Sequence, residues 1–273
     1  MSEKLKKILV IVTATIIAFM SLMPFVWMVF ASFMKSGEAN VYPPKLFPDE
    51  FVLTHYITLF TRLNLTRYLI NSIVISVGVT FISLIINSMS GYAFAKMAFR
   101  GKKQIFNSLL SAMVIPGQVT MLPVFLMLKY MGFINTYWAI IIPGMASIFG
   151  IFLIKQYALS IPDSLIEAAR IDGGTEIQIY WKVILPLCKP ILVTLGIFTF
   201  MGTWNDFLWP LIVMTDSSMY TLPVALANLM GEHTQDTELM MAGSVITIIP
   251  VIIVFLALQK YYIKGIMLGS VKG

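Results

Sequence analysis

The sequence predicts an all-helical membrane protein that crosses the bilayer six times. The chain of 273 residues is 58% hydrophobic and 12% charged, and a soluble fold of this length could not bury so much apolar surface. Six apolar segments each approach the roughly 20 residues that span a hydrocarbon core. Because the core offers no water to backbone groups, such segments cross it as helices. The predicted spans are Ile8–Ala31, Leu69–Ala95, Ile105–Leu128, Trp138–Ile154, Leu187–Met214 and Met241–Tyr262.

The first of these segments follows three lysines, Lys4, Lys6 and Lys7, as the apolar part of a signal peptide would. Its apolar run is about twice as long as that of a signal peptide, and no small-x-small cleavage site follows it. We therefore interpret it as an uncleaved transmembrane helix.

Basic residues predict the orientation of these helices. With the N-terminus inside, fourteen of the nineteen Lys and Arg residues fall on the inner side. Four of the other five lie in the long loop after the first span, where charge constrains translocation least. We therefore expect both termini to be cytoplasmic. The net charge of +6 follows mostly from this bias, and no nucleic-acid surface is needed to explain it.

The residue inventory argues against an enzyme. Cys188 is the only cysteine, so the chain has no internal disulfide or thiolate metal site. His55 and His233 fall in separate loops, so we expect no metal centre, and no cofactor is indicated. The chain lacks a G-x-x-x-x-G-K-[ST] phosphate loop and a nucleophile–base pair, so it cannot itself use ATP.

The longest polar interruption on the predicted inner side, residues 156–186, is organised as a structured element. Ser164 with Glu167, and Thr175 with Gln178, form two capping-box patterns in succession. Each pattern marks the start of a helix, so this loop predicts two short helices near the membrane surface.

Turn residues separate and end these two helices. Gly173–Gly174 lies between them, where a left-handed residue would end the first helix. Pro162 suits the start of the first helix, and Pro186 would stop the second. A loop so fully specified favours a docking element, although an interfacial helix pair lying on lipid headgroups is the alternative.

The contact faces of the two helices differ in side-chain size. The first has small residues beside branched ones, which would let another surface approach its backbone closely. The second has aromatic and branched residues that can pack back onto the membrane helices. These residues are Leu165, Ile166, Ala168, Ala169 and Ile171 in the first helix, and Ile177, Tyr180, Trp181 and Ile184 in the second.

This loop resembles the cytoplasmic signature of ATP-binding-cassette importer permeases, which reads Glu-Ala-Ala, three residues, Gly, nine residues, Ile-x-Leu-Pro. Here Glu167-Ala168-Ala169 and Gly173 precede Val183-Ile184-Leu185-Pro186, and Val183 is the one departure from the pattern. In that family the loop docks into a cleft of a separate ATPase. The resemblance implies a coupling role for Glu167, Ala168, Ala169, Asp172, Gly173, Leu185 and Pro186.

Further motifs resemble the carbohydrate branch of this family. They are Asn71-Ser72, Gly91-Tyr92-Ala93-Phe94-Ala95, Phe99-Arg100-Gly101, Trp204-Asn205-Asp206-Phe207-Leu208-Trp209-Pro210 and the ending Gly269-Ser270-Val271-Lys272-Gly273. The match is nearest to the smaller permease of maltose- or multiple-sugar-type systems.

The resemblance implies a single permease domain over 1–273 with the type I importer architecture, in the cell membrane. It further implies four kinds of partner: a second, different permease; two copies of a cytoplasmic ATPase; an extracytoplasmic solute-binding protein; and a sugar, a di- or oligosaccharide. The lipid bilayer surrounds the assembly.

Two features could mark a solute path. In the second span, polar residues recur every three or four positions and form one stripe, which predicts a face turned toward protein. Small polar residues of this kind more often pack helices than line a path. The stripe comprises Ser72, Ser76, Thr80, Ser83, Asn87 and Ser90, of which Ser76, Thr80, Ser83 and Asn87 are the path candidates.

Asp206 is the stronger candidate for a residue of the solute path, because it is the only clear acid inside a predicted span. A carboxylate at a helix centre costs roughly 2.5–3.5 kcal/mol on insertion, so it should face a cavity or a partner. Trp204 and Asn205 beside it would suit a sugar, which stacks on indole and needs hydrogen bonds. The alternative is that this group anchors the helix end and a kink at Pro210.

Prolines inside the spans predict bends, since proline lacks an N–H and clashes with the preceding turn. These are Pro116, Pro123, Pro143 and Pro250.

Two other function classes stay open at this stage. An ion-coupled secondary transporter would need several intramembrane ionisable residues and an inverted repeat. A membrane scaffold subunit would need no path at all. Of the features that a secondary transporter needs, the sequence has only Asp206 as a clear intramembrane acid and no visible repeat.

Overall fold

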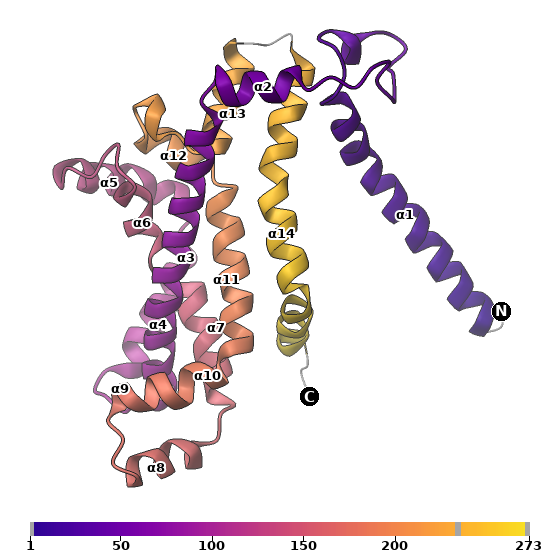
Figure 1. Cartoon of the computed structure of the whole chain (residues 1–273). Coiled ribbons are helices and arrows are strands. Elements are labelled where there is room, and N and C mark those ends of the chain that lie inside the picture. Colours follow the sequence, from indigo (N-terminus) through magenta and orange to yellow (C-terminus); the bar gives the residue numbers. More distant parts are fainter. Residues whose placement is uncertain (1–2, 233–235, 271–273) are drawn as a thin grey trace. The chain divides into compact units, whose positions relative to one another are not determined.

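The computed structural model describes residues 3–232 and 236–270, and every regular element in these ranges is helical (Figure 1). His233 and residues 271–273 of the C-terminal motif lie outside the described residues. The α-helices are α1 (Glu3–Ala31), α2 (Thr54–Thr61), α3 (Leu65–Lys96), α4 (Lys102–Ala112), α5 (Gly117–Tyr130), α6 (Trp138–Gly144), α7 (Ile148–Leu159), α8 (Asp163–Ile171), α9 (Glu176–Ile179), α10 (Leu185–Leu187), α11 (Lys189–Trp204), α12 (Leu208–Val213), α13 (Leu222–Glu232) and α14 (Thr237–Ser270).

Three of the predicted spans are single helices. The helices α1, α3 and α14 are each long and apolar enough to cross a membrane. They contain the predicted segments Ile8–Ala31, Leu69–Ala95 and Met241–Tyr262, so these three predictions are confirmed. Pro250 lies inside α14, and the helix continues past it.

The other three predicted spans are broken. The helices α4 and α5 meet at 104° within Ile105–Leu128, and α6 and α7 meet at 41° within Trp138–Ile154. The helical stretch Glu176–Leu187 meets α11 at 79°, at the start of the predicted span Leu187–Met214. By length and apolar character the described chain has three helices that could cross a membrane, or up to six if each bent pair is one span.

Prolines lie at two of these bends. Pro116 occupies the N-cap of α5, where its missing N–H costs nothing, and Pro143 lies one residue before the end of α6. Pro123, by contrast, lies inside α5, which continues through it.

The prediction of one helix over Leu187–Met214 is wrong. The helix α11 ends at Trp204, and α12 begins only at Leu208. The polar residues Asn205 and Asp206 lie in this break, but apolar segments flank them on both sides, so the hydropathy of the run predicts one span.

The chain divides into two compact units. The first comprises Met1–Thr66 and Leu222–Pro250, and the second comprises Arg67–Thr221 and Val251–Gly273. The single domain expected over 1–273 stays a prediction.

In the first unit, two buried acids fix the segment that follows α1. Glu238, in the first turn of α14, is fully buried and accepts the N–H of Ala39 at 2.7 Å. Glu38 accepts the N–H groups of Asp49 at 2.8 Å and Lys35 at 3.0 Å. These donors hold the pKa of Glu38 below its ordinary value, because they stabilise the carboxylate form.

In the second unit, α8 and α9 lie past the ends of α3 and α11 and run across them (Figure 1). One apolar cluster packs the segment that contains α8 and α9 against α3, α7 and α11. Another packs α12 against α3 and α6. The first includes Tyr92, Ile154, Ile166, Ile179, Tyr180 and Ile184, and the second includes Val79, Ile140, Trp209 and Val213. These clusters position both candidate sites.

Candidate functional site

The loop between α7 and α11 has the helix–turn–helix form that the sequence predicts. Gly173 has a φ of +81°, and its N–H donates to the carbonyl of Arg170 at 3.0 Å. The Gly174 N–H donates to the carbonyl of Ala169 at 2.9 Å, which completes a Schellman motif. A Cβ at Gly174 would lie 2.7 Å from that carbonyl oxygen, so the turn requires both glycines.

The two predicted capping boxes have different outcomes. The box of Thr175 and Gln178 is confirmed: the Gln178 N–H donates to the Thr175 hydroxyl at 3.3 Å, and Gln178 Oε1 accepts the Thr175 N–H at 3.0 Å. The box of Ser164 and Glu167 is wrong. The helix α8 already begins at Asp163, so Ser164 lies inside its first turn and cannot cap it.

The second helix of the loop does not stop at Pro186. It continues from α9 through a π-helical turn, Tyr180–Ile184, and α10, and the 79° bend follows at Cys188. Pro186 lies in the first turn of α10, directly after the π-helical turn, and the first turn of a helix tolerates a proline.

Polar contacts attach the loop to α3 at two points along that helix. Lys96 Nζ donates to the carbonyl of Ile161 and to the carboxylate of Asp163, each at 2.6 Å. The hydroxyls of Ser88 and Tyr180 are 2.6 Å apart. Both ends of the loop are therefore held to one membrane helix.

Glu176 makes a third attachment and joins three elements. The Tyr92 hydroxyl, from α3, donates to Glu176 Oε2 at 2.8 Å. Arg170, from α8, donates from its Nε to Glu176 Oε1 at 2.9 Å. Its Nη2 lies 2.8 Å from the same oxygen. Sequence reasoning missed these residues, because six and 84 positions separate Glu176 from its partners and match no helical spacing.

The far face of the loop is open. Among the loop residues singled out in the sequence, Ala169 and Leu185 are half-buried, whereas Glu167, Ala168, Asp172, Gly173 and Pro186 are exposed. Two large apolar side chains are also exposed there, Ile171 at 86% and Ile177 at 70%. A groove of about 390 Å³ runs along the glycine turn beside Asp172, Gln178 and Lys182.

The polar stripe of α3 faces protein, as predicted. Ser76, Ser83 and Asn87 are buried. Asn87 donates to the Ser83 hydroxyl at 2.7 Å and accepts the Ser147 N–H at 3.0 Å. Because Ser147 is the N-cap of α7, these two residues hold the α6–α7 break and serve packing.

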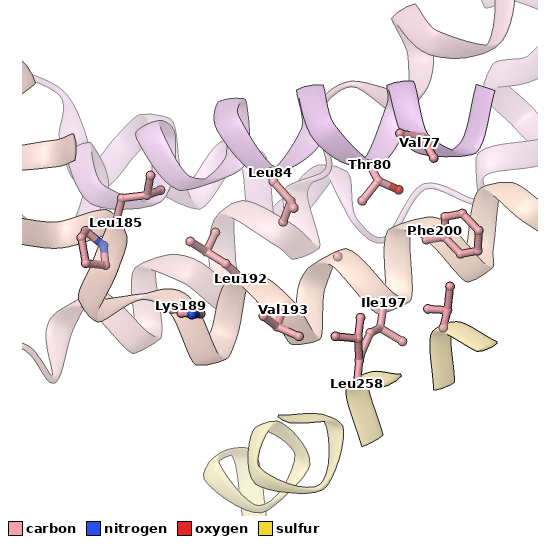
Figure 2. Close-up of a pocket in the computed structure, with 13 residues that line it drawn as sticks. Val77, Thr80, Leu84, Leu185, Lys189, Leu192, Val193, Ile197, Phe200 and Leu258 are labelled. Atoms are coloured by element: carbon pink, nitrogen blue, oxygen red, sulfur yellow. The ribbon is translucent and has the colours of Figure 1, made fainter. Parts of the chain in front are cut away.

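Toward the N-terminal end of α3, two residues of the stripe lack hydrogen-bond partners within the described part of the chain. The hydroxyls of Ser76 and Thr80 are buried and have no hydrogen-bond partner among the described residues. Thr80 lines an apolar groove beside α11 (Figure 2).

The Trp204–Pro210 motif forms the break between α11 and α12. Trp204 is buried and its ring stacks on Phe200, with centroids 5.7 Å apart. Asn205 is exposed, and its amide donates to the Met201 carbonyl at 2.9 Å. In this conformation Trp204 has no free ring face for a sugar, whereas Asn205 is accessible.

Asp206 lies at this break and not inside a continuous helix. Its carboxylate accepts backbone N–H groups, from Trp209 at 3.4 Å and from Leu208. It is half-buried and forms no ion pair with any residue in the described ranges. Asp206 therefore keeps capacity to accept further hydrogen bonds.

Comparisons with known proteins agree on one class. The profile of the family described as "Binding-protein-dependent transport system inner membrane component" matches residues 87–267. The arabinooligosaccharides transport system permease protein AraQ of Halalkalibacterium halodurans is 37% identical over 94% of this chain and 93% of its own length. The melibiose/raffinose/stachyose import permease protein MelC of Bacillus subtilis is 31% identical over 95% of each chain.

A solved structure shares the architecture. A chain of a bacterial ABC transporter involved in the import of the acidic polysaccharide alginate superposes with a TM-score of 0.84 at 28% identity. The match covers 96% of this chain and 99% of that one.

Proposed function

The chain belongs to the family of binding-protein-dependent transport system inner membrane components, and we propose that it is the permease of a carbohydrate importer driven by a separate ATPase. Its relatives are transport permeases and not enzymes. Because these relatives are named for the transport of arabinooligosaccharides and of melibiose, raffinose and stachyose, we propose a di- or oligosaccharide as the solute.

The coupling element in this proposal is the loop from Pro162 to Leu187. The main support for this proposal is the Glu176 carboxylate, which ties the two loop helices to α3. The face of the loop that points away from α3 stays open. A face that is fixed from behind can transmit force, because a push on it moves the membrane helix as well. An interfacial helix pair that only rests on lipid needs no such attachment.

The force would reach the membrane through two routes. One is the set of contacts to α3 made by Tyr92, Ser88 and Lys96. The other is the chain itself, since α10 runs into α11 at the 79° bend. We propose that closure of the ATPase changes this bend and so moves α11.

The orientation and the partners follow from the same proposal. The loop faces the cytoplasm, both termini are cytoplasmic, and the six segments each cross the membrane once. Two ATPase subunits, a second permease and an external solute-binding protein complete the assembly. The apolar surface of α1, in which Ala31 is the one buried residue, is available to lipid or to a second permease.

Asp206 and Asn205 are the proposed solute contacts in this subunit. Both are accessible polar groups at a helix break, and Asp206 keeps unused acceptor capacity. The buried Trp204, Ser83 and Asn87 are better explained by packing.

The test uses Ala168, which is exposed at the open face. In Ala168→Trp the indole finds no obstacle within the chain, but it would clash with a docked ATPase. We expect ATP hydrolysis stimulated by binding protein plus sugar to fall about tenfold or more, since overpacking a fitted interface costs about 1–3 kcal/mol. Insertion in the membrane should be unchanged, and Ala168→Ser is the matched control.

Normal co-purification of an ATPase with Ala168→Trp would contradict docking at this face. Sugar uptake that followed an ion gradient without any ATPase would favour a secondary transporter. Uptake by neither route, with normal assembly, would favour a scaffold subunit.

A further inference from the structure

A groove of about 640 Å³ lies between α3, α10–α11 and the part of α14 beyond Pro250 (Figure 2). Two of its lining side chains are polar, Thr80 and Lys189, and the rest of the lining is hydrocarbon. The apolar lining includes Val77, Leu84, Leu192, Val193, Ile197 and Phe200.

A glycine keeps the floor of this groove open. At Gly196 no side chain projects from α11, and an added Cβ would lie 3.4 Å from Leu84 Cδ1. A Cβ at that distance would make ordinary van der Waals contact with Leu84, so the packing of α11 on α3 does not require this glycine, but the missing side chain widens the groove.

The groove has the length of one leaflet of a bilayer. From Lys189 to Phe200 it follows twelve residues of α11, which are eleven helical rises. At 1.5 Å per residue this is roughly 16 Å, about half of a ~30 Å hydrocarbon core. A lipid acyl chain fits such a groove along its length, with its head end at Lys189 (Figure 2).

The head end carries the charge that an anionic lipid requires. Lys189 is the first residue of α11, is exposed, and forms no ion pair with any described residue. The N-terminus of the 16-residue helix adds partial positive charge at the same place. Basic pockets between membrane helices are known sites for anionic headgroups.

A sugar does not match this lining. Its hydroxyls would meet the Lys189 ammonium at one end and hydrocarbon elsewhere, because the Thr80 hydroxyl is buried, so most would lose their hydrogen bonds.

From this length, lining and charge we propose that the groove binds an anionic phospholipid, with one acyl chain between α3, α11 and α14 and the phosphate on Lys189. Leu185 and Pro186 border the head end, so the lipid lies beside the joint between the proposed coupling loop and α11. This goes beyond the transport function and holds whatever the solute is. Only the assignment to the cytoplasmic leaflet rests on the proposed orientation.

The test is native mass spectrometry of the complete detergent-purified transporter, titrated with phosphatidylglycerol or phosphatidylcholine. We expect the tightest phosphatidylglycerol to bind about fivefold more weakly to Lys189→Gln, which is the effect of one lysine at an anionic surface, with phosphatidylcholine unchanged. Lys103→Gln, an exposed lysine of α4 outside both this groove and the coupling loop, is the matched control and should bind both lipids as before.

A second variant tests the apolar part. Val193→Trp places an indole in the groove, and binding of the tightest lipid of either kind should be lost. Unchanged phosphatidylglycerol affinity in Lys189→Gln would overturn the headgroup contact, and unchanged affinity in Val193→Trp would overturn the groove. Loss of the second permease from Val193→Trp with lipid binding intact would show that a helix of that partner occupies it.

Sugar-stimulated ATP hydrolysis is measured in the same preparations. Lipid binding that fails while this activity persists overturns the lipid site alone. The two proposals can therefore fail separately.

Discussion

Two acidic residues on either side of α11, Glu176 before it and Asp206 after it, have opposite surroundings. Glu176 accepts hydrogen bonds from the Tyr92 hydroxyl and the Arg170 guanidinium, so both of its oxygens are used within the chain. Asp206 accepts only backbone N–H groups, the one from Trp209 at 3.4 Å, and forms no ion pair within the described ranges.

The difference separates a structural carboxylate from an available one. A carboxylate has about four acceptor sites, and a buried or half-buried one gains stability as they are filled. Glu176 has charged and hydroxyl donors that hold three elements together. Asp206 leaves acceptor sites for a group that is not part of this chain, which is what a solute contact needs.

The largest expected effect is on the loop. Glu176→Ala leaves Tyr92 and Arg170 without their acceptor. This should lower the free energy of opening of the loop by about 2 kcal/mol. About 1.5 kcal/mol comes from the hydrogen bond to a charged group and less than about 1 kcal/mol from the partly exposed ion pair. Amide hydrogen exchange over residues 163–187, read peptide by peptide, should accelerate about thirtyfold.

Tyr92→Phe is the graded control for that change, because it removes one donor and leaves the Arg170–Glu176 pair intact. Its acceleration should be smaller and confined to the contact with α3. Exchange at the wild-type rate in Glu176→Ala would show that the apolar cluster alone holds the loop, and the contrast with Asp206 would disappear.

The next effect should appear at the other acid. Asp206→Asn keeps the side-chain shape and one acceptor oxygen but removes the charge. Sugar uptake should fall about tenfold, the effect of a lost hydrogen bond to a charged group, with hydrogen exchange of the loop unchanged. Uptake is measured with radiolabelled sugar in vesicles.

Asp216→Asn is the matched control for Asp206, because it changes another aspartate near the same end of the second unit. The Asp216 carboxylate already accepts the N–H of Ser218 at 2.7 Å and caps a 3₁₀ turn, so its removal should not affect uptake. Equal losses in the two variants would mean that charge at this end, and not a specific contact, supports transport.

The smallest effect is a pH dependence at Asp216. Hydrogen bonds from Ser218 hold the pKa of Asp216 below its ordinary value of 3.8, because they favour the carboxylate form. This stabilisation is present above pH 3.8 and is lost as the pH falls through the lowered value in the folded chain. Exchange at residues 217–219, corrected for the intrinsic rate, should therefore rise only below about pH 4.

Asp216→Asn should remove that rise, since an amide does not titrate in this range. A rise that persisted in the variant would have to come from another group. Glu38, whose pKa is also lowered, lies in the other unit and gives no signal in these peptides.

The sequence predicted most of the local structure of the proposed coupling loop. The glycine turn and the Thr175 capping box follow from contacts three to five residues apart, which a short motif contains completely. The Ser164 box failed although its motif was equally good, because the helix could begin one residue earlier. Local motifs therefore predict that a helix starts, but less reliably at which residue.

The sequence alone determined which segments are apolar, which face of α3 turns toward protein, and where the loop turns. These depend on composition and on spacings of three to five residues. Only the tertiary structure decided where α11 ends, which donors Glu176 binds, and that a leaflet-long groove opens beside Lys189. The physical reason is that a break in an apolar run, a bond across 84 residues and an unfilled space all depend on the neighbouring helices, and no pattern within one helix encodes them.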